Sequence, residues 1–163
     1  MKRLTISCAA CVETLAMLVA MAWADGRLEE TERAGVLGAA DVLNLSKDLR
    51  ARLAEVLQRP VPVDQILFES LSPRDRAFAY IAASWMAGVD EDVDPKEEEL
   101  LDRAASLLGF SPSRKAELER IARDLEPPAE GGRVWSSEIV RLFRAIPPRL
   151  EEAEGDEVEV VFE

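Results

Sequence analysis

Apolar residues in the first 125 positions recur three and four residues apart, which is the spacing of one helix face. One such stripe consists of Leu101, Ala104, Ala105 and Leu108. No stretch of this part of the chain alternates apolar and polar residues convincingly enough to predict a strand. The pattern therefore predicts a body built from helices.

Capping signals mark where several of these helices begin. Ser72, Asp94 and Ser111 each stand directly before a proline. A side-chain oxygen at the N-cap followed by proline at the first helical position is a typical helix start. Together with the apolar spacing, these signals predict seven helical segments. They span residues 6–24, 29–43, 46–58, 63–71, 73–88, 95–108 and 112–125.

An internal repeat organises these segments. The sequence matches itself without gaps when it is shifted along its own length so that Ser46 falls on Ser111. The same shift aligns other identical pairs: Met21 with Met86, Asp25 with Asp90, Glu32 with Glu97, and Leu43 with Leu108. Repetition of this kind indicates similar structural units. We expect an all-α bundle of about seven helices, with a domain at residues 1–125 made of two similar halves, 1–71 and 72–125.

The segment 1–24 has a second interpretation, because a basic start, an apolar run and small residues at Ala22 and Ala24 resemble a secretory leader. The counterpart of this junction, at residues 86–90, lies in mid-chain, where no leader can be. Glu13 also interrupts the apolar centre, and no apolar run reaches the roughly 20 residues that span a bilayer. We therefore expect a core helix and a cytoplasmic protein.

The C-terminal part is predicted to comprise a linker at 126–132, an amphipathic helix at 133–147 and an acidic tail at 148–163. Pro147 and Pro148 are expected to end the helix. Its large apolar residues share one face: Trp135, Ile139, Leu142, Phe143 and Ile146. Two interpretations stay open, because this face could dock on the bundle or could bind a protein partner.

The final segment, 157–163, alternates apolar and acidic side chains, with Val158, Val160 and Phe162 as the apolar positions. We expect this segment to be disordered on its own. Its alternation could let it pair as a strand with the sheet edge of another protein.

Composition narrows the function classes. The net charge of −12 argues against a nucleic-acid partner, because phosphate binding depends mostly on Lys and Arg. The chain has no histidine, which removes the commonest general base and the commonest transition-metal ligand. The two cysteines, Cys8 and Cys11, have the spacing of a redox pair or of half a zinc site. No further Cys or His completes a zinc site, so core packing is the simpler interpretation and redox chemistry the alternative.

Each half carries three acidic residues spaced by four and then three positions, at the junction of its first two helices. They are Asp25, Glu29 and Glu32, and Asp90, Asp94 and Glu97. Carboxylates at a helix start can cap backbone N–H groups without any metal. Three that converge could also bind a hard cation such as Ca²⁺ or Mg²⁺. An EF-hand does not fit, because Pro95 and Leu101 replace the glycine and glutamate that define its loop.

The doubled pattern resembles the bacterial tellurite-resistance TerB-like family over roughly residues 8–125. The segments that carry the resemblance are AWADGRLEETE followed by LNLS, and AGVDEDVDPKEEE followed by LGFS. The resemblance implies an all-helical bundle of two similar halves, a cytoplasmic setting and links to metal-stress or phage-defence genes. It also implies that the six junction carboxylates bind divalent cations. Arg27 in the first junction, and Glu91 in place of glycine in the second, depart from the family pattern.

These observations lead to one functional expectation. The protein is expected to be a non-enzymatic helical interaction module with a protein partner, acting in stress response or complex assembly and binding a divalent cation. The alternatives are an enzyme subunit whose junction carboxylates hold Mg²⁺, and a membrane-surface adaptor that uses the arginine-bordered helix around Trp135.

Overall fold

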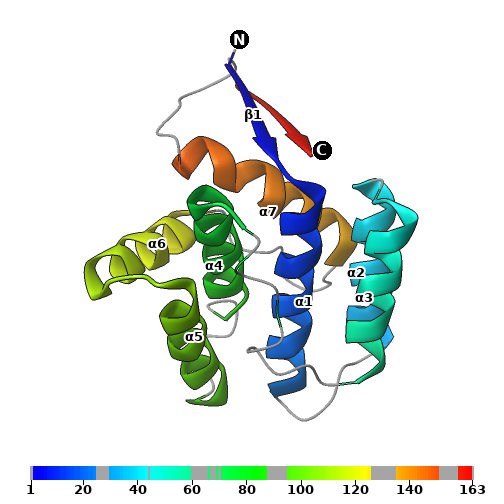
Figure 1. Ribbon diagram of the computed structural model, residues 1–163, viewed down its shortest axis with the longest axis horizontal. Coiled ribbons are helices and arrows are strands. Elements are labelled where there is room, and N and C mark those ends of the chain that lie inside the picture. The colour runs from blue at the N-terminus through cyan, green and yellow to red at the C-terminus, as the bar shows by residue number, and fades with distance from the viewer. Residues whose placement is uncertain are drawn as a thin grey trace.

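The computed structural model describes residues 2–24, 30–43, 45–59, 66, 69, 71–87, 95–125, 135–150 and 158–162. This part of the chain forms seven α-helices and two short strands (Figure 1). The strands are β1 (Lys2–Ile6) and β2 (Val158–Phe162). The helices are α1 (Cys8–Ala24), α2 (Glu30–Val42), α3 (Lys47–Gln58), α4 (Pro73–Ala87), α5 (Pro95–Leu108), α6 (Pro112–Asp124) and α7 (Trp135–Leu150). The predicted all-α class is confirmed. Most of the predicted helix at 63–71 lies outside the described residues, and α7 is the seventh helix.

The internal repeat is visible in where the helices begin. Helices α4, α5 and α6 each start at the position that the repeat aligns with the first residue of α1, α2 and α3, respectively. Hydrogen bonds repeat with the same shift, because the Ser46 Oγ accepts from the Leu49 N–H and the Ser111 Oγ accepts from the Arg114 N–H. The Ser7 and Ser72 hydroxyls cap α1 and α4 in the same way. The two halves therefore share local geometry as well as sequence.

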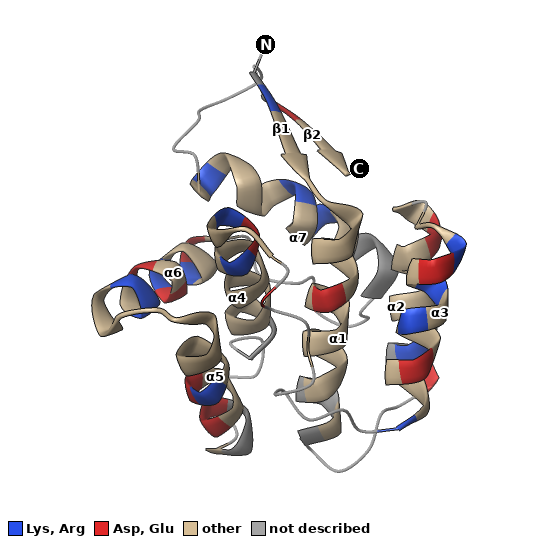
Figure 2. Cartoon of the chain, in the orientation of Figure 1, with Lys and Arg blue, Asp and Glu red and all other residues tan. Residues whose placement is uncertain are grey.

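Helices α1 and α4 form the centre of the bundle. They contact each other, while α2 and α3 lie on one side of the pair and α5 and α6 on the other (Figure 1). Glu13 is the only charged residue within α1 (Figure 2). Such a helix is stable only when its whole circumference is buried. The largest fully buried side chains accordingly include Leu15, Met17 and Leu18 of α1 and Phe78, Tyr80 and Ile81 of α4.

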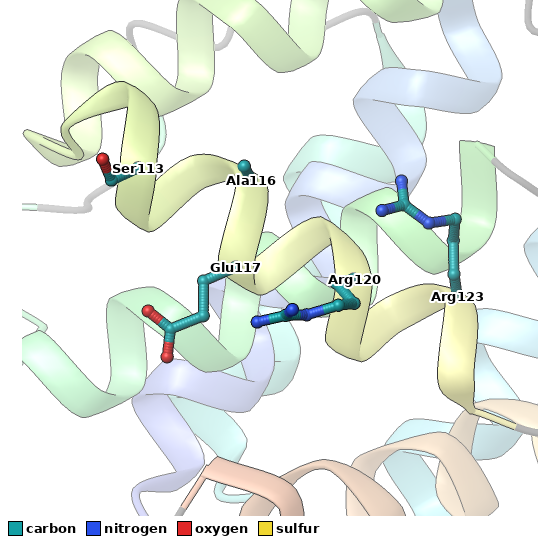
Figure 3. A pocket seen from close by; sticks show the side chains of 5 residues that line it. All are labelled: Ser113, Ala116, Glu117, Arg120 and Arg123. Carbon is teal, nitrogen blue, oxygen red and sulfur yellow. The ribbon is translucent and has the colours of Figure 1, made fainter.

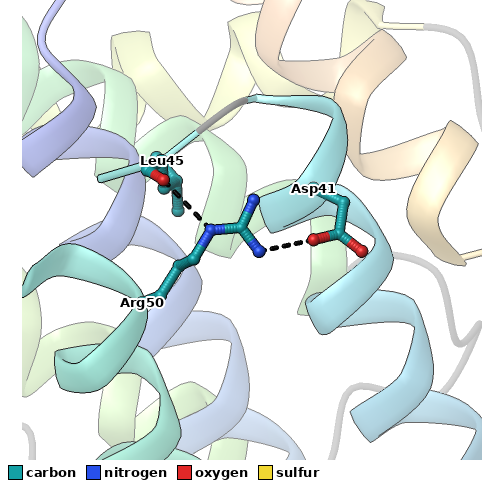
Figure 4. Close-up of polar contacts among 3 residues, drawn as sticks. All are labelled: Asp41, Leu45 and Arg50. Carbon is teal, nitrogen blue, oxygen red and sulfur yellow. Dashed lines mark hydrogen bonds and ion pairs between the residues drawn. The ribbon is translucent and has the colours of Figure 1, made fainter. Parts of the chain in front are cut away.

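A polar contact fixes the connection between α2 and α3 (Figure 4). Arg50 on α3 donates from its Nε to the Leu45 carbonyl oxygen at 3.0 Å and from a terminal nitrogen to Asp41 of α2. The pair is partly exposed on both sides, so its role is to orient the turn between the two helices rather than to stabilise a buried charge.

Helix α7 docks on the bundle, mainly against α2 and also against α4. Three residues of its apolar face are buried: Leu142, Phe143 and Ile146. Of the two interpretations of this face, the structure therefore shows the docked one. The prediction that Pro147 and Pro148 end the helix is wrong, because α7 continues through both to Leu150. Each proline removes one backbone hydrogen bond. Burial of Ile146 and Pro147 against the bundle offsets that loss.

The two strands pair in parallel, with Lys2 opposite Val158 and Ile6 opposite Phe162. The predictions that residue 6 begins a helix and that this region contains no strand are therefore wrong. The prediction that the final segment is disordered on its own is wrong for residues 158–162, which form β2 and pair with β1 of the same chain. Leu4 and Ile6 point into the protein and are buried, whereas Arg3 beside them is exposed. This alternation anchors the strand pair to the bundle.

Candidate functional site

The predicted cation ligands can be placed only in part. Asp25, Glu29, Asp90 and Asp94 lie outside the described residues. Glu32 and Glu97 are the third residues of α2 and α5, and their side chains are not described. Within the described ranges, no group of three or more Cys, Asp or Glu side chains is arranged to hold a metal ion. Cation binding at the junctions therefore stays a prediction.

The predicted partner-binding face belongs to α7. Its members Leu142, Phe143 and Ile146 lie in the core, while the side chains of Trp135 and Ile139 are not described. The Phe143 ring meets the Phe78 ring of α4 edge to face. A partner could reach this face only by displacing α7 from α2 and α4.

A polar cluster joins the beginnings of α1 and α4. Ser7 precedes α1, and its Oγ accepts a hydrogen bond from the Ala10 N–H at 3.1 Å. The same hydroxyl donates to the Asp75 Oδ2 at 3.2 Å. Arg74 donates to the Thr5 carbonyl oxygen of β1. Two residues of α4 therefore hold the segment that leads from β1 into α1.

Both cysteines belong to the first turns of α1 beside this cluster. Cys8 is partly exposed and Cys11 is fully buried, and both sulfurs are thiols. Burial raises the pKa of the Cys11 thiol far above its usual range, and the neighbouring Cys8 and Asp75 raise that pKa further. Asp75 itself is only 7% exposed. Its Oδ1 is buried and accepts no hydrogen bond from any described residue.

The sequence places the two cysteines on a helix but does not reveal their proximity to Asp75, which in the sequence is only an acidic residue at a helix start. A signal is nevertheless present in the internal repeat. The shift that aligns Ser7 with Ser72 also aligns Ala10 with Asp75. Equivalent positions at the N-termini of two paired helices can be neighbours in space.

The core also contains an ion pair between α1 and α3. The Glu13 carboxylate is almost fully buried, and its Oε1 accepts from the Arg52 guanidinium at 3.2 Å. The second oxygen, Oε2, accepts no hydrogen bond from a described residue. A buried carboxylate needs such a cation because desolvation disfavours an isolated charge. This pair explains the acidic residue that interrupts the apolar run of α1.

The outer face of α6 carries a shallow surface pocket of about 410 Å³ (Figure 3). It is lined by Ser113, Ala116, Glu117, Arg120 and Arg123. The opposite face of α6 is fixed to the bundle, because Leu118 and Ala122 are buried. The Tyr80 hydroxyl of α4 also donates to Glu119 at 2.8 Å. The pocket residues are therefore presented on a rigid element.

Charges on α6 are divided between paired and unpaired groups. Arg114 forms an ion pair with Glu117, and Lys115 contacts Asp102 and Glu119. The Asp102 carboxylate, with Glu119, raises the pKa of the Lys115 ammonium. Arg120 and Arg123 are exposed and form no ion pair with any described residue. The pocket thus offers two guanidinium groups to an external anion.

Comparison with known proteins identifies the family. Residues 9–122 match the family described as "Protein of unknown function (DUF533)". This match covers more than half of the chain, so the chain belongs to that family. It spans α1 to α6 almost completely. The comparison with curated proteins gives no match, and neither does the comparison with solved structures. In the part of the chain that the structure describes, no helix is long and apolar enough to cross a membrane.

Proposed function

We propose that this member of the DUF533 family is a non-enzymatic helical interaction module that binds an acidic segment of a protein partner on the outer face of α6. The observation that carries the proposal is the pocket at Arg120 and Arg123. Arg120 and Arg123 are three positions apart on one face of α6, so an anionic segment that lies along the helix can contact both. A guanidinium also binds carboxylates in a bidentate manner.

The charge distribution supports an acidic partner. The chain has a net charge of −12, so it repels acidic molecules over most of its surface. An acidic segment gains attraction at exposed arginines such as this pair, and on α6 the arginines also border a pocket that can take a side chain of the segment. The rigid attachment of α6 through Leu118, Ala122 and Tyr80 lowers the entropy lost on binding.

The TerB-like assignment, the cytoplasmic setting and the role in stress response belong to the same proposal. The family match supports the first, because DUF533 falls within the TerB-like superfamily. Divalent-cation binding at Asp25, Glu29, Glu32, Asp90, Asp94 and Glu97 is proposed on the sequence pattern alone. Calorimetry with Ca²⁺ and Mg²⁺ tests it, with an Asp94→Asn/Glu97→Gln variant as the comparison.

A fluorescent peptide rich in Asp and Glu tests the α6 surface. We expect its anisotropy to rise with the wild-type protein and its affinity to fall about tenfold or more in an Arg120→Glu/Arg123→Glu variant, which corresponds to roughly 1.4 kcal/mol. Because the contact is electrostatic and exposed, binding is expected to weaken as salt is added.

The matched control reverses two other exposed arginines. Arg141 and Arg144 have the same spacing of three positions on α7 and are also exposed. The variant Arg141→Glu/Arg144→Glu changes the net charge by the same amount and is expected to bind the peptide like the wild type. Equal losses in the two variants would show that only net charge matters, and the α6 surface would then have no specific role.

A further inference from the structure

The two cysteines at the start of α1 differ in their exposure to solvent. Cys8 is the first residue of the helix and is partly exposed, whereas Cys11 lies one turn further and is fully buried. The N-terminal end of a helix favours negative charge, which suits a thiolate at Cys8. An external molecule therefore has access to Cys8 but not to Cys11.

The buried Asp75 carboxylate lies against the same turn. Its Oδ2 is held at 3.2 Å by the Ser7 hydroxyl, which also caps the Ala10 N–H. Its Oδ1 has no hydrogen-bond donor among the described residues, although Asp75 is only 7% exposed. A buried polar atom without a partner is rare and costs stability, so it requires an explanation. One explanation fits both the burial of Asp75 and its unpaired oxygen: the carboxylate accepts a proton from a neighbouring acid.

We propose that Cys8 and Cys11 form a reversible intramolecular disulfide by exchange with a disulfide-containing molecule, and that Asp75 accepts the proton of Cys11 in the closing step. The spacing suits this bond because residues three positions apart are neighbours on the surface of a helix. Residues three apart in a helix have Cβ atoms about 5–6 Å apart, and a disulfide needs about 4 Å.

The reaction proceeds in two exchanges. The Cys8 thiolate attacks one sulfur of the external disulfide, a mixed disulfide forms, and the external thiolate leaves and takes up a proton. The Cys11 sulfur then attacks the Cys8 sulfur while its proton passes to the Asp75 Oδ1. The bond between Cys8 and the external sulfur breaks, and the external thiolate that leaves takes up a proton from solvent. Asp75 then releases to solvent the proton that it accepted from Cys11. The two cysteines are oxidised by two electrons and the external disulfide is reduced to two thiols.

The role of Asp75 follows from the state of Cys11. Burial, together with the nearby Cys8 and Asp75, raises the pKa of Cys11, so its thiol is protonated at neutral pH. Attack as a thiolate requires loss of that proton in a place that bulk water does not reach. A carboxylate with an open oxygen supplies the acceptor there.

Incubation of the full chain with mixtures of reduced and oxidised glutathione tests the disulfide, with intact mass as the measurement. We expect the wild type to lose two hydrogen atoms as the oxidised fraction rises and to carry no glutathione at the end. A wild-type protein that keeps both thiols, or that ends with glutathione attached, overturns the proposal.

Cysteine variants test the order of attack. The Cys11→Ala protein is expected to stop at one bound glutathione, because no second thiol can close the bond. The Cys8→Ala protein is expected to stay unmodified in its folded state, because Cys11 is buried. Rapid modification of Cys11 in the Cys8→Ala protein would contradict the assignment of Cys8 as the attacking residue.

An Asp75→Asn variant tests the proton acceptor. At neutral pH we expect the release of the glutathione that is bound to Cys8 to slow by about tenfold or more. The difference from the wild type is expected to shrink as pH rises, because hydroxide can then remove the Cys11 proton whenever the first turn of α1 opens transiently, without help from Asp75. An Asp102→Asn variant, which changes an exposed carboxylate on α5, is expected to close at the wild-type rate.

A rate for Asp75→Asn equal to the wild type, or a deficit that does not change with pH, would show that Asp75 has only a structural role. Circular dichroism verifies that the variant is folded. If Asp75→Asn does not fold, the wild type and the two cysteine variants still decide whether the disulfide forms.

Discussion

The Phe143 ring of α7 meets the Phe78 ring of α4 edge to face, with centroids 5.0 Å apart and planes inclined at 67°. Both side chains are fully buried. This contact connects the last helix of the chain to the central pair, and it makes α7 a structural part of the bundle.

Replacing Phe143 with alanine is expected to lower the free energy of unfolding by about 3–5 kcal/mol, because the change removes a buried ring and leaves a cavity. Urea denaturation followed by circular dichroism measures the loss. Arg144→Ala is the neighbouring control, and it is expected to change stability by less than about 0.5 kcal/mol because Arg144 is exposed. Equal losses would mean that α7 does not dock through this ring.

Removing the cation of the core ion pair is expected to destabilise the folded protein. An Arg52→Met variant leaves the buried Glu13 carboxylate without this partner, so we expect a loss of about 2–4 kcal/mol in unfolding free energy. Adding Glu13→Gln to that variant removes the buried charge and is expected to recover part of the loss. A double variant less stable than Arg52→Met alone would contradict this account.

Gly109, directly after α5, has a φ of 81°, a backbone conformation that residues with a side chain rarely adopt. Its neighbour Phe110 donates from its N–H to the Ala105 carbonyl oxygen at 3.1 Å and closes the helix end. No atom lies within 4 Å of an added Cβ, so Gly109→Ala is expected to cost about 1 kcal/mol through backbone strain alone. Gly109→Asn is expected to cost less, because asparagine tolerates this conformation. Thermal unfolding compares the two, and equal losses would argue against a strain effect.

Stability is expected to fall at alkaline pH in the presence of a reductant. The Cys11 pKa is raised in the folded state from its ordinary value of 9.0, so above that pH the unfolded chain loses a proton that the folded chain keeps. The free energy of unfolding then decreases by roughly 1 kcal/mol per pH unit from this group. Denaturation at several pH values measures the slope. A Cys11→Ala variant is expected to show a shallower decline above pH 9.0, and an unchanged slope would assign the decline to other groups.

The helices can be predicted from sequence because their determinants are local. Capping serines at positions 46, 72 and 111 precede α3, α4 and α6, and the internal repeat indicates the counterparts of these helices. The helix through Pro147 and Pro148 cannot be predicted in this way. Its last turn depends on burial against distant elements, which overrides the local preference of proline.

Contacts between distant residues account for the other differences. Strand β1 is short, and its partner is far away in sequence, so no hairpin signal marks it. Asp75 meets Ser7 across 68 positions, and only the packing of α4 on α1 brings the two together. The thiol site is therefore apparent only in three dimensions, whereas the two cysteines alone are compatible with simple packing.

The pairing of β1 with β2 has a consequence for the order of events during translation. The seven described helices lie between the two strands, so β1 leaves the ribosome before these helices and β2 leaves it after them. Closing so long a loop is slow and follows the more local helix contacts. Until residues 158–162 arrive, Leu4 and Ile6 belong to an unpaired strand edge, which invites pairing with other nascent chains. Completion of this short sheet thus ends the period in which the newborn protein is most prone to aggregate.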